Sequence, residues 1–311
     1  MLRVHQILLF LSLITNSLES KDKNYSILFL GHGFGSHSVI DNSLDPAFLN
    51  YFSKNQKKFN KVVLGGDFIY DCDSTLEVEN FLEFYDNNNV NFVIGNHENC
   101  DNLFKLNEVS SKNHHELINE SLIFYLNTST EDESKIDKTF SYIESTISKE
   151  LPKNVIIFTH QLIFSDSDWF VRVNSRKFYE YGNTLYQQIY EKYYGKTLPF
   201  FFVAGDLGAY DFTPHTFYHN DSNFTMLASG IGNSYNSKAI KINLNKKVEY
   251  SIINLLSGNE ENVNKYSKSK VQLYQFPKLV LSIIKRNYLL SISVLIIFIL
   301  VYLTKIKSYK K

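Results

Sequence analysis

The sequence predicts an α/β domain followed by one long apolar segment near the C-terminus. Five apolar runs of strand length alternate with segments of helical patterning, which is typical of α/β folds. Each run ends in a group of Gly, Asp, Asn or His residues. Because ligand sites of open α/β sheets form at the carboxyl ends of the strands, these groups are candidates for a functional site.

The predicted strands are short, strongly apolar and bounded by turn-forming residues, as buried strands are. They cover residues 27–31, 61–65, 91–95, 154–159 and 199–205. After residue 215 the pattern changes to three short β-like segments separated by turns. These segments cover 224–230, 238–244 and 248–256.

Helical segments are predicted between the strands from their start signals and patterning. Asp45 and Pro46 open a predicted helix at 45–55, because Pro fits the first helical turn. Ser74 and Glu77 have the spacing of a capping box and predict a helix at 74–87. Further helices are predicted at 140–151 and 185–194.

The formal net charge of zero combines two parts of opposite sign. Residues 21–275 carry 24 basic and 31 acidic residues, whereas residues 276–311 carry seven basic residues and no acid. An acidic body argues against a nucleic-acid protein held by a strongly basic surface. Two cysteines are too few for a disulfide-dense scaffold or a zinc site built from cysteines.

Both ends of the chain carry membrane signals. Residues 287–304 contain no charge, and at about 1.5 Å per residue they span about 27 Å, enough for a thin bilayer. A buried core helix is the alternative, but such a helix rarely lacks polar positions over five turns. Residues 1–20 have the pattern of a secretory signal peptide, with an uncleaved anchor as the alternative.

These signals predict the organisation and topology of the chain. The four Lys residues of 305–311 predict a cytoplasmic basic tail after the membrane helix. The domain at 21–256 is therefore expected outside the cytoplasm, joined to the membrane helix by a polar linker at 257–286. The prediction is a single-pass membrane protein.

The groups at the strand ends contain the side chains that could bind a metal. Asp67 with Asp71 follows the second strand, and Gly95-Asn96-His97-Glu98 follows the third. His32, His160 and Asp206 follow the first, fourth and fifth strands. A Gly-Asp pair alone is more often a turn, but a combined set of imidazole, carboxylate and amide groups suits Zn, Mn or Fe.

In order and spacing, these motifs resemble those of the calcineurin-like metallophosphoesterase superfamily, and the chain is identified as a divergent member. The family pattern is DxH, GDxxD, GNHE or GNHD, a single His after a strand, and GHxH. The resemblance covers roughly residues 26–245, with GNHE at 95–98 as its strongest match. It implies a four-layer αββα fold, a β-sandwich flanked by helices, with one or two divalent ions (Mn, Zn or Fe) at the strand ends.

The resemblance also implies roles for individual residues. Asp67 matches the carboxylate that bridges two metals, and Asn96 and His160 match ligands of the second metal. Asp206 stands where the first His of GHxH would, which is also a second-metal position. His97 matches the His that assists the leaving group or stabilises the transition state, and Asp71 or Asp73 could orient it.

The first metal site departs from the family pattern. DxH is replaced by His32-Gly33-Phe34, the second His of GHxH by Gly208, and Asp71 comes one residue later than in GDxxD. His32 is expected either to bind a metal at a weakened first site or to contact the phosphate directly.

The predicted function is a metal-dependent phosphoester hydrolase that uses a metal-activated water on a phosphomonoester or phosphodiester. Loss of two first-site ligands motivates the alternative, a non-catalytic binding or assembly module of the cell envelope. A Ser-nucleophile hydrolase has little support, because no G-x-S-x-G motif occurs.

Three further features are candidates for the site. Arg172 and Arg176 could bind a phosphate bidentately, with a solvated loop face as the alternative. Cys72 and Cys100 lie near the predicted site and are candidates for a disulfide, with two separate small side chains as the alternative.

Overall fold

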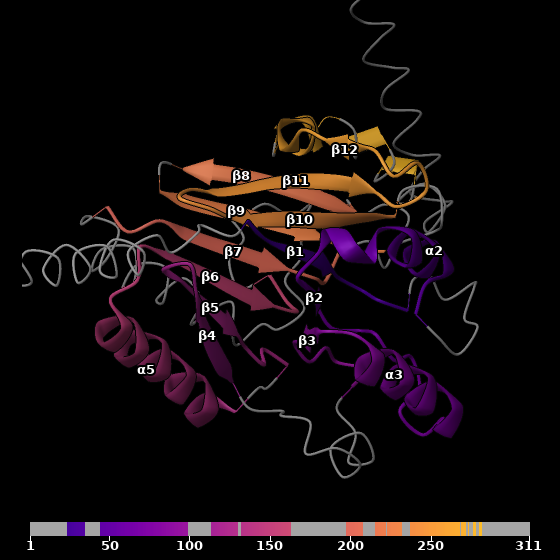
Figure 1. Cartoon of the computed structure of the whole chain (residues 1–311), viewed down its shortest axis with the longest axis horizontal. Coiled ribbons are helices and arrows are strands. Elements are labelled where there is room, and N and C mark those ends of the chain that lie inside the picture. Colours follow the sequence, from indigo (N-terminus) through magenta and orange to yellow (C-terminus); the bar gives the residue numbers. More distant parts are fainter. Residues whose placement is uncertain are drawn as a thin grey trace, which may run out of the picture.

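Two six-stranded sheets form the centre of the molecule in the computed structural model (Figure 1). The structure describes residues 24–34, 44–98, 113–129, 132–162, 197–207, 215–221, 223–231 and 237–267, and eight residues between 269 and 281. Both sheets combine parallel and antiparallel pairs. The α/β class expected from the sequence is therefore confirmed as a fold with two mixed sheets.

The first sheet has the strand order β12-β11-β10-β1-β2-β3. Strands β1 (Tyr25–Leu30), β2 (Lys61–Leu64) and β3 (Val90–Phe92) run parallel. The antiparallel part of the sheet consists of β10 (Lys238–Leu244), β11 (Val248–Asn254) and the short β12 (Glu260–Glu261).

The second sheet has the order β4-β5-β6-β7-β9-β8. Its four central strands are parallel: β5 (Ser121–Tyr125), β6 (Asn154–Thr159), β7 (Phe200–Ala204) and β9 (Phe224–Ser229). The edge strands β4 (His114–Ile118) and β8 (Thr216–Asp221) pair antiparallel.

Three hydrophobic cores hold four layers together. Alternate residues of a strand point to opposite faces, so Leu28 and Leu30 of β1 pack with the helices α2 (Pro46–Asn55) and α3 (Thr75–Asn87). Ile27 and Phe29 instead pack between the two sheets, where the Phe29 ring stacks on Phe158 at 5.3 Å. Helix α5 (Glu133–Glu150) covers the second sheet on the far side (Figure 1).

Each of the helices α2, α3 and α5 begins at a side-chain cap. The Asp45 carboxylate accepts hydrogen bonds from the backbone N–H groups of Ala47 and Phe48, which satisfies two otherwise unpaired donors. Ser74 caps α3, as its spacing predicted, and Asp132 caps α5. The part of the chain that the structure describes also contains the 3-10 helices η1 (Gln56–Lys58) and η4 (Val263–Tyr266).

The predicted elements agree with the observed ones over most of the described chain. The five predicted strands correspond to β1, β2, β3, β6 and β7, and the three later segments to β9, β10 and β11. Helix α5 begins seven residues before the predicted start, and β4, β5 and β8 were not predicted. The helix predicted at 185–194 lies outside the described residues.

The predicted signal peptide, membrane segment 287–304 and basic tail 305–311 also lie outside the described residues. Within the part of the chain that the structure describes, we find no helix with both the length and the apolar character needed to cross a bilayer.

Candidate metal centre

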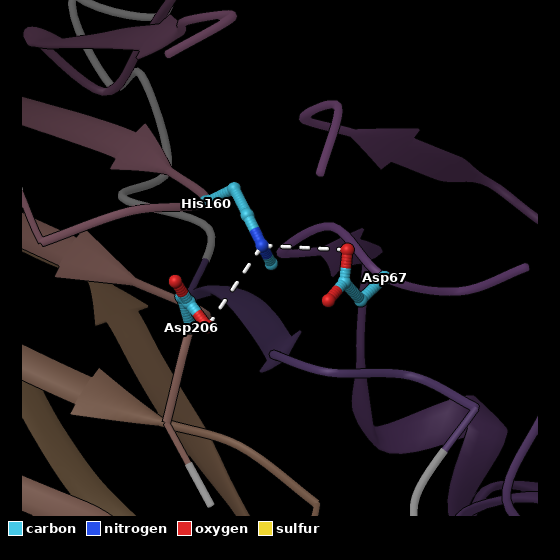
Figure 2. Close-up of side chains that lie close together, drawn as sticks. All are labelled: Asp67, His160 and Asp206. Atoms are coloured by element: carbon cyan, nitrogen blue, oxygen red, sulfur yellow. Dashed lines mark ion pairs between the residues drawn. The ribbon is translucent and has the colours of Figure 1, made fainter. Parts of the chain in front are cut away.

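Asp67, His160 and Asp206 come together at the carboxyl ends of the strands (Figure 2). Asp67 follows β2 of the first sheet, whereas His160 and Asp206 follow β6 and β7 of the second. One ligand atom from each lies within 4.8 Å of the others, and all three residues are buried. The cluster therefore lies where the two sheets meet.

The His160 ring is surrounded by oxygen atoms on one side. Its Nε2 lies 3.4 Å from Asp67 Oδ1, 4.0 Å from Asp206 Oδ1 and 3.2 Å from Asn96 Oδ1. Its Nδ1 lies 2.8 Å from the Gly65 carbonyl oxygen, which can only accept, so Nδ1 carries a proton and donates it. In the neutral ring the Nε2 lone pair then faces the oxygens, an arrangement that a proton or a metal ion between them would stabilise.

The electrostatics of the cluster also favour added positive charge. Burial alone would lower the pKa of His160, but the Asp67 and Asp206 carboxylates outweigh it and raise that pKa. Burial, assisted by the charge of Asp67, raises the pKa of Asp206 to about 6, although His160 and His97 act in the opposite direction. Among the described residues, the buried Asp206 Oδ2 has no hydrogen-bond partner.

These observations fit a bound divalent ion. Two carboxylates, one imidazole and one amide oxygen form a mixed N/O set of the kind that Zn, Mn and Fe accept. The carbonyl partner on His160 Nδ1 orients the ring as second partners of metal-binding histidines do. The buried Oδ2 of Asp206 would be available as a further ligand atom.

The close approach of the strand ends depends on glycine. A Cβ atom on Gly205 would lie 2.0 Å from the Gly65 carbonyl oxygen, and one on Gly31 would lie 2.3 Å from the Gly205 Cα atom. Gly66 has a φ of 82°, in the left-handed region that glycine tolerates best. The backbones that carry His32, Asp67 and Asp206 can therefore meet without side chains between them.

Asp67 itself has a positive φ of 51°, and the buried Glu98 stabilises this conformation. Glu98 Oε2 accepts the backbone N–H groups of Asp67 and Gly95 at 2.9 and 2.8 Å. Glu98 Oε1 accepts those of Phe68 and Ile69 at 2.6 and 3.0 Å. Sequence reasoning noted the Glu98 carboxylate only as part of the GNHE turn and missed its contact with the Asp67 loop.

Burial raises the pKa of Glu98 to about 7, and the neighbouring Asp67 charge adds to this rise. The backbone N–H groups of Ile69 and Gly95 act in the opposite direction, because they donate to the carboxylate. Glu98 is thus, after Asp206, a second buried carboxyl group with a raised pKa at this site.

His97 lies next to the cluster with its ring held on three sides. Its backbone N–H lies 3.3 Å from Asp67 Oδ1, and its Nδ1 donates to the Tyr70 carbonyl oxygen at 2.9 Å. The ring stacks on Tyr70 and meets the edge of Phe34, at centroid distances of 5.3 and 5.1 Å. The Asp71 carboxylate, predicted as an orienting group, accepts the backbone N–H of Asp73 at 3.0 Å.

His32 lies on the other side of Asp67. Its Nε2 is 3.6 Å from Asp67 Oδ2, so the two carboxylate oxygens of Asp67 face two different histidines. The Phe34 ring packs against His32 at 4.6 Å between ring centroids. Phe34 stands at the position where DxH would have its second metal ligand, and it cannot bind a metal.

The remaining sequence candidates are only partly described. Cys72 is disulfide-bonded, and its Sγ lies 2.9 Å from the His97 carbonyl oxygen. Cys100, the other cysteine of the chain, lies outside the described residues, as do Gly208, Arg172 and Arg176. The structure therefore brings together His32, Asp67, Asn96, His97, His160 and Asp206 from the predicted set.

Two mixed sheets with a carboxylate and imidazole cluster at their joined strand ends define a metallophosphoesterase fold. A comparison with family models agrees: the model described as calcineurin-like phosphoesterase matches residues 36–198. The chain belongs to the calcineurin-like phosphoesterase family. No curated protein matches the chain.

Among solved structures, the chain is similar to purple acid phosphatase PPD1 isolated from yellow lupin (Lupinus luteus) seeds. The TM-score is 0.50 at 10% sequence identity, and the match covers 77% of this chain and 53% of the phosphatase chain. This chain thus spans about half the length of the plant enzyme. At this identity the similarity concerns the fold alone.

Proposed function

We propose that the chain is a metal-dependent phosphoester hydrolase whose ion is bound by Asp67, Asn96, His160 and Asp206. The buried cluster of two carboxylates and one imidazole is the observation that carries this proposal. Buried carboxylates that lie close together destabilise a fold unless a cation offsets their charge. Membership of the calcineurin-like phosphoesterase family supports hydrolysis as the reaction.

The residues around the cluster have separable roles in this reaction. A bound divalent ion supplies Lewis-acid chemistry, polarising a phosphoryl oxygen and making water a stronger nucleophile at neutral pH. The Gly65 carbonyl oxygen keeps His160 Nε2 directed at the carboxylates. The Tyr70 carbonyl oxygen accepts the proton on His97 Nδ1, so when the ring carries a second proton it lies on Nε2, from which it can be donated to the leaving oxygen.

His32 extends the site beyond the four proposed ligands. Asp67 Oδ2 faces His32, so His32 could have one of two roles. It could bind a second ion together with Asp67, or it could contact the phosphate directly. Two ions per chain in elemental analysis would support the first role. One ion per chain, together with weaker phosphate binding in His32→Ala, would support the second.

Turnover assays test the hydrolase directly. The full chain is assayed with p-nitrophenyl phosphate and bis(p-nitrophenyl) phosphate after addition of Mn²⁺ or Zn²⁺, beside His97→Ala and His160→Ala. We expect metal-dependent turnover that both substitutions reduce. Absence of metal-dependent turnover, or equal turnover in wild type and His160→Ala, would contradict the proposal.

A non-catalytic binding module is the second candidate, and the position of Phe34 favours it. The phenyl ring packs on both His32 and His97, at the side of the site where the family pattern has metal ligands. Replacing Phe34 by His would restore one ligand type at that position. A gain of turnover in Phe34→His from an inactive wild type would indicate that Phe34 keeps the wild-type site from hydrolysing phosphoesters, as expected of a non-catalytic module.

We further propose that the domain is exported and tethered by the C-terminal apolar segment. The support lies in the sequence: a signal-like 1–20, an uncharged 287–304 and a Lys-rich 305–311. A reporter that is active only in the cytoplasm, fused after Lys311, should be active. An inactive reporter in a chain that is membrane-bound would reverse the topology.

A further inference from the structure

Two buried glutamates accept all five successive backbone N–H groups of the loop Asp67–Asp71. Glu98 accepts the first three, as described above. Glu77 Oε2 accepts the last two, from Tyr70 at 2.8 Å and from Asp71 at 3.0 Å. The loop that carries Asp67 and contacts His97 is therefore fixed along its whole length by carboxylates from outside it.

Glu77 lies in the first turn of α3, where the capping box predicts a role in starting the helix. Ser74 Oγ does accept the Glu77 backbone N–H at 3.4 Å. The Glu77 carboxylate, however, binds the loop upstream of the helix and is buried, with a relative exposure of 6% for the residue. Burial of a carboxylate is costly, so a function in the loop is a better explanation for Glu77 than helix capping.

The peptide group between Tyr70 and Asp71 connects Glu77 to His97. In a planar trans peptide the C=O and the N–H point in opposite directions. The N–H of this peptide donates to Glu77, and its C=O accepts from His97 Nδ1 at 2.9 Å. Fixing one end of the peptide therefore fixes the direction of the other, and a carboxylate on the N–H also polarises the carbonyl.

We propose that Glu77 is a positioning residue that acts on His97 through the Tyr70–Asp71 peptide. It holds the proton of the neutral ring on Nδ1 and directs Nε2 to the reaction site. A carboxylate thus orients the histidine without touching it, while Asp71 makes a turn with Asp73. The catalytic part of this inference rests on the proposed hydrolase function, whereas the structural part does not.

The variants separate the hydrogen-bond acceptor from other properties of the side chain. Glu77→Met removes the acceptor and keeps an unbranched side chain. In Glu77→Gln the amide oxygen can take the place of Oε2, which accepts both N–H groups, so this variant should restore the contact. Glu79, which is exposed on the same helix, provides the matched control Glu79→Met.

NMR of the full chain with ¹⁵N-labelled histidine gives a readout that does not depend on turnover. At mildly alkaline pH, wild type, Glu77→Gln and Glu79→Met should show His97 with its proton on Nδ1. Glu77→Met should show a mixture of both tautomers. A folded Glu77→Met protein with the wild-type tautomer would overturn the inference, whether or not the chain proves to be a hydrolase.

Turnover gives the second readout. Glu77→Met should lower kcat for an alkyl phosphate ester about ten- to a hundredfold, because a displaced proton donor loses most of its contribution. Metal affinity should be retained, since Glu98 still holds Asp67. In a His97→Ala background, Glu77→Met should have no further effect on kcat. An equal loss in both backgrounds, or a failure of Glu77→Gln to restore kcat, would indicate a structural role only.

Discussion

His160 Nε2 lies 3.4 Å from Asp67 Oδ1, although the two residues follow strands of different sheets. The contact exists only because the carboxyl ends of β2 and β6 lie at the same end of the packed sheets. An ion bound between these atoms would join the two sheets and stabilise the folded chain by its binding free energy. Stability, metal affinity and turnover are therefore linked at one place in the molecule.

The first prediction concerns the pH dependence of the metal-free protein. Burial and Asp67 raise the pKa of Asp206 to about 6, above the value of about 3.8 of an exposed aspartate. The folded state thus binds more protons than the unfolded state between these values, and stability falls as the pH rises through them. Deprotonation of His160, whose pKa is also raised, acts in the same direction.

Asp206→Asn should remove this loss. Between about pH 5 and about pH 8, metal-free wild type should lose about 1 to 2 kcal/mol more unfolding free energy than the variant. Urea denaturation in the presence of a chelator measures the difference, and Glu98 contributes equally to both proteins. Parallel pH profiles for the two proteins would contradict the raised pKa of Asp206.

The second prediction concerns the glycine contact between the sheets. In Gly205→Ala the new Cβ atom would meet the Gly65 carbonyl oxygen at 2.0 Å, and neither backbone can move away without separating the strand ends. We expect a loss of about 3 kcal/mol or more in unfolding free energy. Thermal and urea denaturation of the metal-free proteins measure it.

Gly258→Ala is the matched control. Gly258 has a φ of 73°, but a Cβ atom there would come no closer than 3.8 Å to its neighbours. This variant should lose only about 1 kcal/mol, from the strained φ alone. Similar losses in the two variants would show that the approach of the strand ends does not limit stability.

The third prediction concerns His97 as a proton donor. A good leaving group departs without protonation, whereas an alkyl leaving group requires it. His97→Ala should therefore lower kcat/KM by about a hundredfold or more for an alkyl phosphate ester, and far less for a p-nitrophenyl ester. A uniform loss for both classes would assign His97 to binding or charge stabilisation.

The fourth prediction separates the two glutamates of the loop. Glu98→Gln places an amide NH₂ group against backbone N–H donors, so the Asp67 loop should shift. Metal affinity should fall by about tenfold or more. Glu77→Met, which removes the acceptor, should leave it unchanged, because Glu77 binds the far end of the loop. Calorimetric titration with Mn²⁺ measures the metal affinity of both variants. Equal losses of affinity would contradict separate roles for Glu98 and Glu77.

Most strands were predictable because they are apolar runs buried on both faces, as in β6 and β7. The run at Ser121–Tyr125 is equally buried and was still missed. It follows the partly exposed β4, whose sequence His114–Ile118 alternates little and contains Glu116. Pairing with β6 determines that Ser121–Tyr125 forms a strand, and such tertiary pairing leaves no local pattern in the sequence.

The site was predictable where its side chains carry the chemistry. Asp67, Asn96 and His160 stand in recognisable motifs, and the structure brings them together with Asp206. The partners of His97 and of the Asp67 loop were not predictable. Tyr70 contributes a backbone carbonyl, which any residue carries, and Glu77 reaches backward from a position that suits a capping box equally well.

Metal content of the purified full chain tests the central claim most directly. The proteins are equilibrated with Mn²⁺ or Zn²⁺, dialysed and subjected to elemental analysis. We expect wild type, and Glu249→Gln as a surface control, to retain at least one ion per chain, and Asp206→Asn to lose it. A wild-type chain without bound metal, or an Asp206→Asn chain with the wild-type content, would contradict a metal centre at Asp67, Asn96, His160 and Asp206.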